Sequence, residues 1–213
     1  MSTNQRRALI VIDVQNEYFT GKLPIEYPNP QETVVNVGNA MDAARAAGIP
    51  IIVVQQTSPA GSALFGVDTD GWQLHAVVAS RPFDHHVRKT LPSCYAATDL
   101  AQWLQANSIN ILTVIGYMTH NCDFSTMNQA LHDGLAVEFL HDASGSVSYL
   151  NHAGYASAQD IHHVISVVLQ SRFAAVMSTQ EWVDIVKMDS VPVRDNIYES
   201  NQRARNHVRD NRP

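Results

Sequence analysis

The amino-acid sequence predicts an α/β fold with three layers, α-β-α, in which helices cover both faces of a mostly parallel sheet. Two observations support this prediction. Short apolar runs alternate with helical patterns along the chain, which is typical of successive parallel β-α units. Most of these runs are also apolar at successive positions rather than at alternate ones, as expected for strands that are covered on both faces.

Four or five apolar runs are predicted as strands, and the patterns between them as helices. The strands are Ala8–Val14, Pro50–Gln55, Ile109–Gly116, Leu135–Leu140 and Arg172–Met177. The helices are Glu32–Ala47, Ala96–Ala106, Cys122–Asp133 and His152–Gln170. Gly48 and Gly134 stand just before strands, where helix C-caps belong. In such a sheet the ligand site lies at the carboxyl ends of the strands.

Composition limits the class of protein. The chain has 213 residues, of which 45% are hydrophobic, and a net charge of −6, which argues against a nucleic-acid partner. Its apolar run near the N-terminus, Ala8–Ile12, is broken by Asp13 and is too short for a signal sequence or a membrane span. Two cysteines do not form a disulfide framework. We therefore expect a cytoplasmic protein that binds no membrane.

Two segments stand outside the repeating pattern. Residues 58–88 are long and irregular, and we interpret them as an excursion over the site rather than as a second domain. Residues 189–213 are polar, contain five arginines and show no apolar face with helical period. We predict one domain over residues 1–188 and a tail over 189–213, either disordered or an arm that orders on a neighbouring subunit.

Cys122 follows a predicted strand and opens a predicted helix. Unpaired N–H groups and the helix dipole stabilise a thiolate in such a first turn and lower its pKa, which suits a nucleophile. A cysteine at this junction can equally be a small packed hydrophobe. Spacing alone leaves both interpretations open.

Asp13 and Lys89 are the candidate partners of this thiol. A carboxylate at the end of the buried run ALIVID is costly unless it is paired, so Asp13 is either a general base or a cap for the next turn. Lys89 is one of only three lysines and follows the short β-like run His86–Arg88. It either stabilises the thiolate or is an exposed loop lysine.

These three residues and their surroundings resemble a known family. Asp13 in ALIVIDVQNEYF, Lys89 before TLPSCY and Cys122 in GYMTHNC are similar to the Asp-Lys-Cys triad of the isochorismatase-like cysteine hydrolases, a superfamily with a Rossmann-like sheet. Nicotinamidases, N-carbamoylsarcosine amidohydrolases and isochorismatases belong to it. The resemblance runs from about Ala8 to Val186 and keeps the order of the three residues.

One motif carries most of the resemblance. Gly116-x-x-Thr119-x-x-Cys122 is followed at the family's spacing by Thr126, Ala130 and Gly134. Asp13-Val14-Gln15-Asn16 and Asp142-Ala143 are supporting matches.

The resemblance implies a mechanism. Asp13 takes the thiol proton, the Cys122 sulfur attacks an acyl carbon, and water hydrolyses the thioester that results. The family places the oxyanion hole on backbone N–H groups, here those of Met118 and Cys122. It also implies a cis peptide bond between Tyr117 and Met118, and family members are dimers or higher homo-oligomers.

The chain departs from the family at two places. Nicotinamidases hold a metal with an Asp and a His after the second strand, where this chain has Gln56 and Ser58. An amide and a hydroxyl are poor substitutes for these ligands, so we predict no metal site and no cofactor. Asp123 stands where the family has an apolar residue, and we expect its carboxylate to point away from Cys122.

The predicted function is a metal-independent cysteine hydrolase that cleaves a C–N bond in a small amide, ureido or lactam substrate. Its predicted substrate walls are Phe19, Gln56, Tyr117 and Tyr149. Cys94 is expected to be a packed thiol. The alternatives are an isochorismatase-type vinyl-ether hydrolase, which needs no nucleophile, and a non-catalytic binding protein on the same fold.

Overall fold

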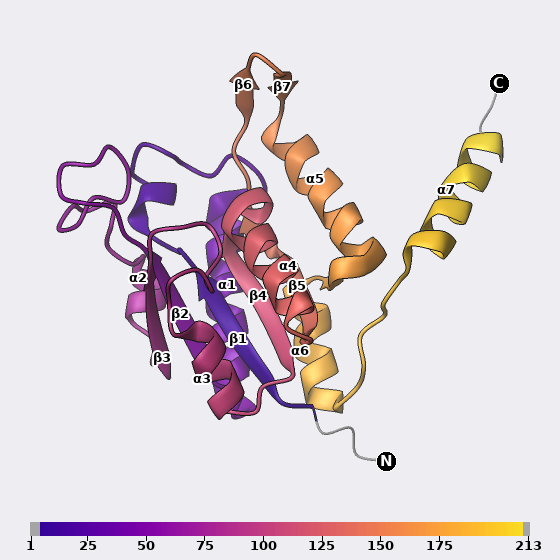
Figure 1. The fold of residues 1–213 in the computed structure, drawn as a ribbon, viewed down its shortest axis with the longest axis horizontal. Helices are drawn as coiled ribbons and strands as arrows, with labels where there is room; N and C mark the ends of the chain where they lie inside the picture. The colour runs from indigo at the N-terminus through magenta and orange to yellow at the C-terminus, as the bar shows by residue number, and fades with distance from the viewer. Residues whose placement is uncertain (1–4, 211–213) are drawn as a thin grey trace.

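The computed structural model describes residues 5–210 and has one sheet of six strands with helices on both faces (Figure 1). The strands lie in the order β3-β2-β1-β4-β5-β8, and every neighbouring pair is parallel. Their bounds are Arg7–Ile12 for β1, Ile51–Gln56 for β2, His85–Lys89 for β3, Ile111–Tyr117 for β4, Ala136–Gly145 for β5 and Ala175–Met177 for β8.

Two hydrophobic cores lie on opposite faces of the sheet. Successive residues of β1 alternate between them, because neighbouring side chains of a strand point to opposite faces: Leu9 and Val11 belong to one core, Ile10 to the other. The first core is closed by α1 (Pro30–Ala46), α2 (Ala76–Ala79) and α6 (Thr179–Met188). The second is closed by α3 (Leu100–Ala106), α4 (Phe124–His132) and the end of α5 (Ala158–Val168). The predicted three-layer fold is confirmed.

The strand order reverses between β1 and β4. Strands β2 and β3 extend the sheet on one side of this pair, and β5 and β8 extend it on the other. Ligands of open parallel sheets bind at such a reversal, outside the carboxyl ends of the strands. Asp13 directly follows β1, and the segment that contains Cys122 directly follows β4.

Several predicted boundaries were wrong. The chain from 152 does not continue directly into a helix, because residues before α5 form an antiparallel hairpin of β6 (Tyr149–Asn151) and β7 (Gly154–Ala156). This hairpin rises beyond the rest of the fold near the start of α5 (Figure 1). The last strand is shorter than predicted because a π-helical turn, Leu169–Phe173, occupies its first residues.

The C-terminal tail contains a helix that the sequence analysis did not predict. Helix α7 spans Ile197–Asp210 and stands apart from α5 and the sheet (Figure 1). The predictions for residues 1–4 and 211–213 lie outside the described residues. Within residues 5–210, no helix is both long and apolar enough to cross a membrane.

Candidate active site

Three side chains meet at the carboxyl ends of the central strands. The Lys89 ammonium lies 2.6 Å from Asp13 Oδ2 and donates a hydrogen bond of 3.2 Å to the Cys122 sulfur. Lys89 thus links the Asp13 carboxyl to the Cys122 thiol. Both members of the ion pair are fully buried, and Cys122 is 4% exposed. The sequence motifs that predicted these residues, far apart in the chain, thus come together.

Burial and charge set the protonation of this cluster. Burial raises the pKa of Asp13, although the Lys89 ammonium opposes the rise. Burial alone would lower the pKa of Lys89, but the Asp13 carboxylate and the Cys122 thiol outweigh it and hold the pKa above its usual value. The 2.6 Å contact between the two groups favours the charged form of each.

The Cys122 thiol differs from the sequence expectation. Burial and the Asp13 carboxylate raise its pKa, and the opposing effect of Lys89 is smaller. The prediction of a thiolate stabilised by the helix dipole was therefore wrong for the free protein. A protonated thiol needs a base to remove its proton before the sulfur can attack, and the Asp13 carboxyl, paired with Lys89 beside the thiol, is the candidate base.

Close approach of two strands brings Asp13 to Cys122. Gly116 on β4 has φ of +115°, and a Cβ atom there would lie 2.0 Å from the carbonyl oxygen of Ile12 on β1. Only glycine fits this position. Asp13 itself has φ of 52°, a left-handed conformation that is uncommon outside glycine and redirects the chain at the strand end.

Gln15 fixes the position of the loop after β1. Its side-chain nitrogen donates to the carbonyl oxygens of Gln56, at 3.0 Å, and Trp72, at 2.7 Å, and its oxygen accepts from the Gln56 amide at 2.9 Å. Gln56 then accepts a hydrogen bond of 2.7 Å from Lys89. A chain of hydrogen bonds thus runs from the loop after Asp13 to the Lys89 ammonium.

Cys122 belongs to a π-helical turn, Thr119–Asp123, that precedes α4. The peptide bond from Tyr117 to Met118 is cis. The carbonyl oxygen of Met118 accepts hydrogen bonds from the amides of Asn121, at 3.0 Å, and Asp123, at 3.2 Å. Met118 and Cys122 both line the same cavity. The backbone here is therefore held in one tight turn beside the thiol.

The cavity above the thiol has a volume of about 400 Å³ and an apolar wall. Its lining residues are Tyr18, Leu23, Gln56, Leu64, Phe65, Thr90, Leu91, Pro92, Met118, Asn121, Cys122 and Tyr149. None of these side chains carries a charge at neutral pH in the part of the chain that the structure describes. The cavity is suited to a small, uncharged molecule with an apolar part.

Two of the four predicted wall residues line this cavity, and two do not. Gln56 and Tyr149 lie in the wall, and the Tyr149 hydroxyl is 2.9 Å from Nε2 of His120. Tyr117 is fully buried behind the wall, where its hydroxyl lies 2.6 Å from Oγ1 of Thr33. Phe19 packs edge-on against Tyr117, outside the cavity. Phe19 follows Asp13 by six residues and Tyr117 is next to Met118, but these places in the sequence did not determine where the side chains point.

Sequence reasoning missed the residues that the loops contribute. Leu64 and Phe65 come from the irregular segment 58–88, and Leu91 and Pro92 stand two and three residues after Lys89. The segment was expected to cover the site, but its lack of periodicity gave no signal for individual side chains. Leu91 and Pro92 were adjacent to a candidate catalytic residue and could have been found on that ground.

Asp123 is buried in a separate hydrogen-bond network. Ser144 donates a bond of 2.6 Å to Asp123 Oδ2, and the Ser144 hydroxyl also lies 2.7 Å from that of Thr119. Burial raises the pKa of Asp123 to about 7, and the Ser144 bond only partly opposes this. The carboxyl is thus directed to β5. Cys94 is fully buried, and burial raises the pKa of its thiol.

Within residues 5–210, no group of three or more His, Cys, Asp or Glu side chains is arranged to hold a metal ion. Gln56, at the position where the resemblance would place a metal ligand, has its side-chain oxygen bonded to Lys89.

The sequence and fold were compared with those of known proteins. The isochorismatase domain model matches residues 7–181. A crystal structure from Burkholderia xenovorans LB400, of a protein named as a candidate isochorismatase, is 62% identical, with a TM-score of 0.95 over 97% of this chain and 99% of that one.

Two curated relatives have named activities. Streptothricin hydrolase of Streptomyces noursei is 31% identical over 84% of this chain and 62% of its own length. Ureidoacrylate amidohydrolase of Variovorax paradoxus is 27% identical over 64% of this chain and 68% of its own.

Proposed function

Because the chain belongs to the isochorismatase family of hydrolases, we propose that it is a metal-independent cysteine hydrolase that cleaves a C–N bond of a small amide, ureido or lactam substrate. One observation carries this proposal: the buried pair of Asp13 and Lys89 contacts the sulfur of Cys122 at the floor of a cavity. A nucleophile beside an oriented base is the arrangement that covalent hydrolysis requires. The name of the relative from Variovorax paradoxus, an amidohydrolase, supports the same bond type.

Acylation begins when the substrate carbonyl carbon lies above the Cys122 sulfur. Asp13 accepts the thiol proton while the C–S bond forms, and the carbonyl electron pair moves to the oxygen. Backbone N–H groups of Met118 and Cys122 stabilise this oxyanion in our proposal. The intermediate collapses, and the amine leaves with the proton that Asp13 received.

Deacylation uses the same carboxylate. Asp13 takes a proton from a water molecule, whose oxygen attacks the thioester carbon and forms the product acid. The sulfur leaves and regains its proton from Asp13. Lys89 remains charged throughout. Its contacts hold the Asp13 carboxylate and the Cys122 sulfur in fixed positions beside each other.

The cavity lining favours uncharged substrates. Isochorismate is a dicarboxylate, and binding two carboxylates in a buried site requires cationic or strongly donating side chains. Among the residues that the structure describes, the one buried cation near the cavity is Lys89, and it already bonds to Asp13, Gln56 and Cys122. The same lining disfavours the vinyl-ether alternative and supports a neutral amide, ureido compound or lactam.

Two further features complete the proposal. Both cysteines are free, as is usual in a reducing compartment, and we place the enzyme in the cytoplasm. We also propose a homo-oligomer, a dimer or a tetramer.

The test is a panel of neutral small amides, ureido compounds and lactams, each paired with an analogue that carries a carboxylate. Ammonia release and ring-opened acids would be followed with the native protein and with Cys122→Ala. We expect turnover of neutral members by the native protein alone. Turnover by Cys122→Ala would exclude the thioester route. Isochorismate is tested beside the panel, and its consumption in place of the amides would establish the vinyl-ether reaction. Inactivity on every substrate would favour the binding protein.

A further inference from the structure

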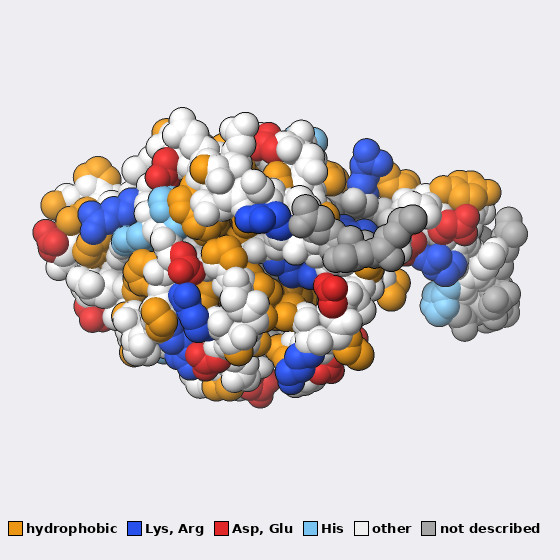
Figure 2. All heavy atoms as spheres, turned by 90° about the horizontal axis from the view of Figure 1, so that it is seen from below, with side chains coloured by type: hydrophobic (Ala, Val, Ile, Leu, Met, Phe, Trp, Pro, Cys, Tyr) orange, Lys and Arg blue, Asp and Glu red, His pale blue; other side chains and the backbone are white. Residues whose placement is uncertain are grey.

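Helix α7 packs only lightly on the described part of its own chain. It spans 14 residues, Ile197–Asp210; its main contact with the body is at the π-helical turn Leu169–Phe173, and Ser200 in its first turn lines the cavity beside α5. Two views at right angles show the helix clear of the body (Figure 1, Figure 2). Ile197 is 57% exposed and Tyr198 is 68% exposed. The helix therefore leaves large apolar side chains in water.

Local interactions alone do not account for such a helix. An isolated helix shorter than about 12–15 residues is marginal in water even for alanine-rich sequences. The Asn196 side chain caps the amide of Glu199 at 2.9 Å, and Arg203 pairs with Asp195. Exposed contacts of this kind contribute about 1 kcal/mol or less each. Helices are normally stabilised by packing, so α7 needs a surface that its own body does not provide.

The segment before α7 is fixed to the body. Arg194 donates a hydrogen bond of 3.0 Å to the carbonyl oxygen of Val137, and Gln170 donates one of 3.3 Å to that of Val193. Pro192 is buried. The helix thus leaves the body from an anchored base, in a direction that keeps it away from the apolar face beside it.

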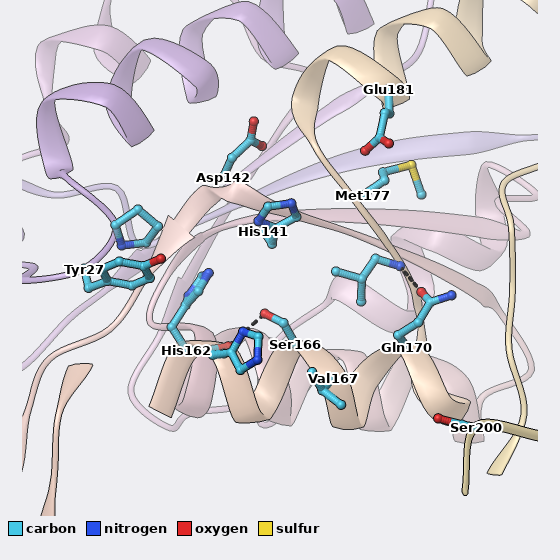
Figure 3. Close-up of a pocket in the computed structure, with 13 residues that line it drawn as sticks. Tyr27, His141, Asp142, His162, Ser166, Val167, Gln170, Met177, Glu181 and Ser200 are labelled. Carbon is cyan, nitrogen blue, oxygen red and sulfur yellow. Dashed lines mark hydrogen bonds between the residues drawn. The ribbon is translucent and has the colours of Figure 1, made fainter. Parts of the chain in front are cut away.

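That apolar face lies on α5. Val164 is 56% exposed, Val167 is 54% exposed and Val168 is 39% exposed, and their spacing places them on one stripe of the helix. The stripe continues into a cavity of about 620 Å³ between α5, α6 and the edge strand β8. Figure 3 shows Val167 and Met177 at its wall, with Ser200 of α7 at one end.

The charges of the two surfaces are complementary. Glu181 extends from α6 into the cavity (Figure 3), and Asp142 also lines it. Helix α7 carries an exposed arginine, Arg205. It lies further along the helix than the apolar residues Ile197 and Tyr198 of the first turn. A helix laid in the groove can thus place Ile197 or Tyr198 on the valines and Arg205 near the carboxylates.

We propose that α7 of each chain packs on the α5 stripe of a second copy, over the cavity at Glu181, and that the exchange is reciprocal. The same two surfaces then occur on both chains, as a two-fold dimer requires. Each copy supplies the packing surface that the other copy's helix lacks. This inference is independent of the proposed reaction.

The molar mass of the full chain in solution tests it. We expect a dimer by light scattering after gel filtration, and a monomer for a chain truncated after Ser190. Val164→Asp is expected to give a monomer as well, because it places a carboxylate in the apolar contact. Val35→Asp on α1 is the matched control, because Val35 is 57% exposed and lies outside the proposed contact. It should remain a dimer.

A second experiment identifies the contact directly. Chains with Ala204→Cys are mixed with chains with Val164→Cys and oxidised, and we expect a disulfide-linked dimer that neither variant forms as readily alone. The native Cys94 and Cys122 are buried and do not compete. A full chain that is monomeric would overturn the proposal, as would a dimer that survives the truncation. A dimer that needs α7 but tolerates Val164→Asp and gives no cross-link would place the helix on another surface and would equally refute it.

Discussion

The Lys89 ammonium nitrogen lies 2.6 Å from Asp13 Oδ2, and both side chains are fully buried. A buried ion pair of this kind stabilises the fold little more than a pair of apolar side chains would. Removing one partner, however, leaves an uncompensated charge in an interior that solvates it poorly. The two residues therefore depend on each other for stability as well as for the proposed chemistry.

Lys89→Met is expected to lower the free energy of unfolding by about 3–5 kcal/mol, because it leaves the Asp13 carboxyl without its counter-ion. Adding Asp13→Asn to this variant should recover part of the loss. Urea unfolding of the two single variants and the double variant measures this coupling. Lys187→Met is the control, since Lys187 is exposed on α6, and it should change stability by no more than about 0.5 kcal/mol. Additive effects of Lys89→Met and Asp13→Asn would contradict the pairing.

The raised pKa of the Cys122 thiol predicts that little thiolate is present in the free protein. The thiolate absorbance near 240 nm, taken as the difference between the native protein and Cys122→Ala, should stay close to zero from about pH 6 to pH 9. Cys94→Ala should give the same flat titration as the native protein, because the pKa of Cys94 is raised as well. A thiolate signal already present at pH 6 would mean that Lys89 outweighs burial and that Asp13 is not needed as the base.

Tyr149 is the aromatic wall residue that the β6–β7 hairpin contributes to the cavity. Tyr149→Ala should raise KM by about tenfold, equivalent to about 1.4 kcal/mol, with a smaller change in kcat, because the residue contacts substrate away from the reacting carbon. Tyr149→Phe should keep most of the affinity, since only the bond to His120 is lost.

Tyr155→Ala is the control for Tyr149, because Tyr155 lies on the same hairpin and is 69% exposed. We expect its steady-state constants to equal those of the native protein. If both alanine variants raise KM equally, the hairpin as a whole, rather than the Tyr149 ring, shapes the site.

Asp123 predicts a dependence of stability on pH. Its pKa in the folded chain is about 7, against an ordinary value of 3.8, so the folded state binds more protons than the unfolded state between these values. The free energy of unfolding should therefore fall as the pH rises from about 4 to 7, by up to a few kcal/mol.

Asp123→Asn removes this titration while its side-chain oxygen can still accept the bond from Ser144. The variant should gain stability relative to the native protein as the pH is raised from 5 to 8, as measured by urea unfolding at each pH. Asp133→Asn, at an exposed site after α4, should show no such trend. A constant difference between native and Asp123→Asn proteins at all pH values would contradict the raised pKa.

The sheet was predictable from sequence because its strands are buried on both faces. Runs such as ALIVI have few alternative environments in a folded protein. The hairpin at Tyr149–Ala156 was not predicted, because its residues are mostly exposed and carry no clear alternation. Helix α6 was also missed, although Ser178 and Glu181 form a capping box that a search for helix starts would find.

The placement of the candidate residues Asp13, Lys89 and Cys122 was predictable because each stands at a strand end or just after one, where chain direction and sheet topology fix the position. The cavity wall was only partly predictable. Tyr117 is next to Met118 in sequence, yet its ring is buried in the core with its hydroxyl 2.6 Å from that of Thr33, outside the cavity lining. The side-chain direction after a strand depends on backbone turns that composition does not reveal. The pKa of the Cys122 thiol likewise depends on how deeply the side chain is buried, and the local sequence motif does not predict that burial.

The cavity joins two kinds of structure. Asp13, Lys89 and Cys122 are held by the ends of β1, β3 and β4, whereas Leu64, Leu91 and Tyr149 come from loops and a hairpin that pack around them. The hydrogen bonds that join Gln15, Gln56 and Lys89 involve none of these loop and hairpin side chains, so substitutions there do not remove them. The architecture is therefore modular with respect to evolution: a lineage can acquire new substrates through its loops while the reactive centre is inherited intact.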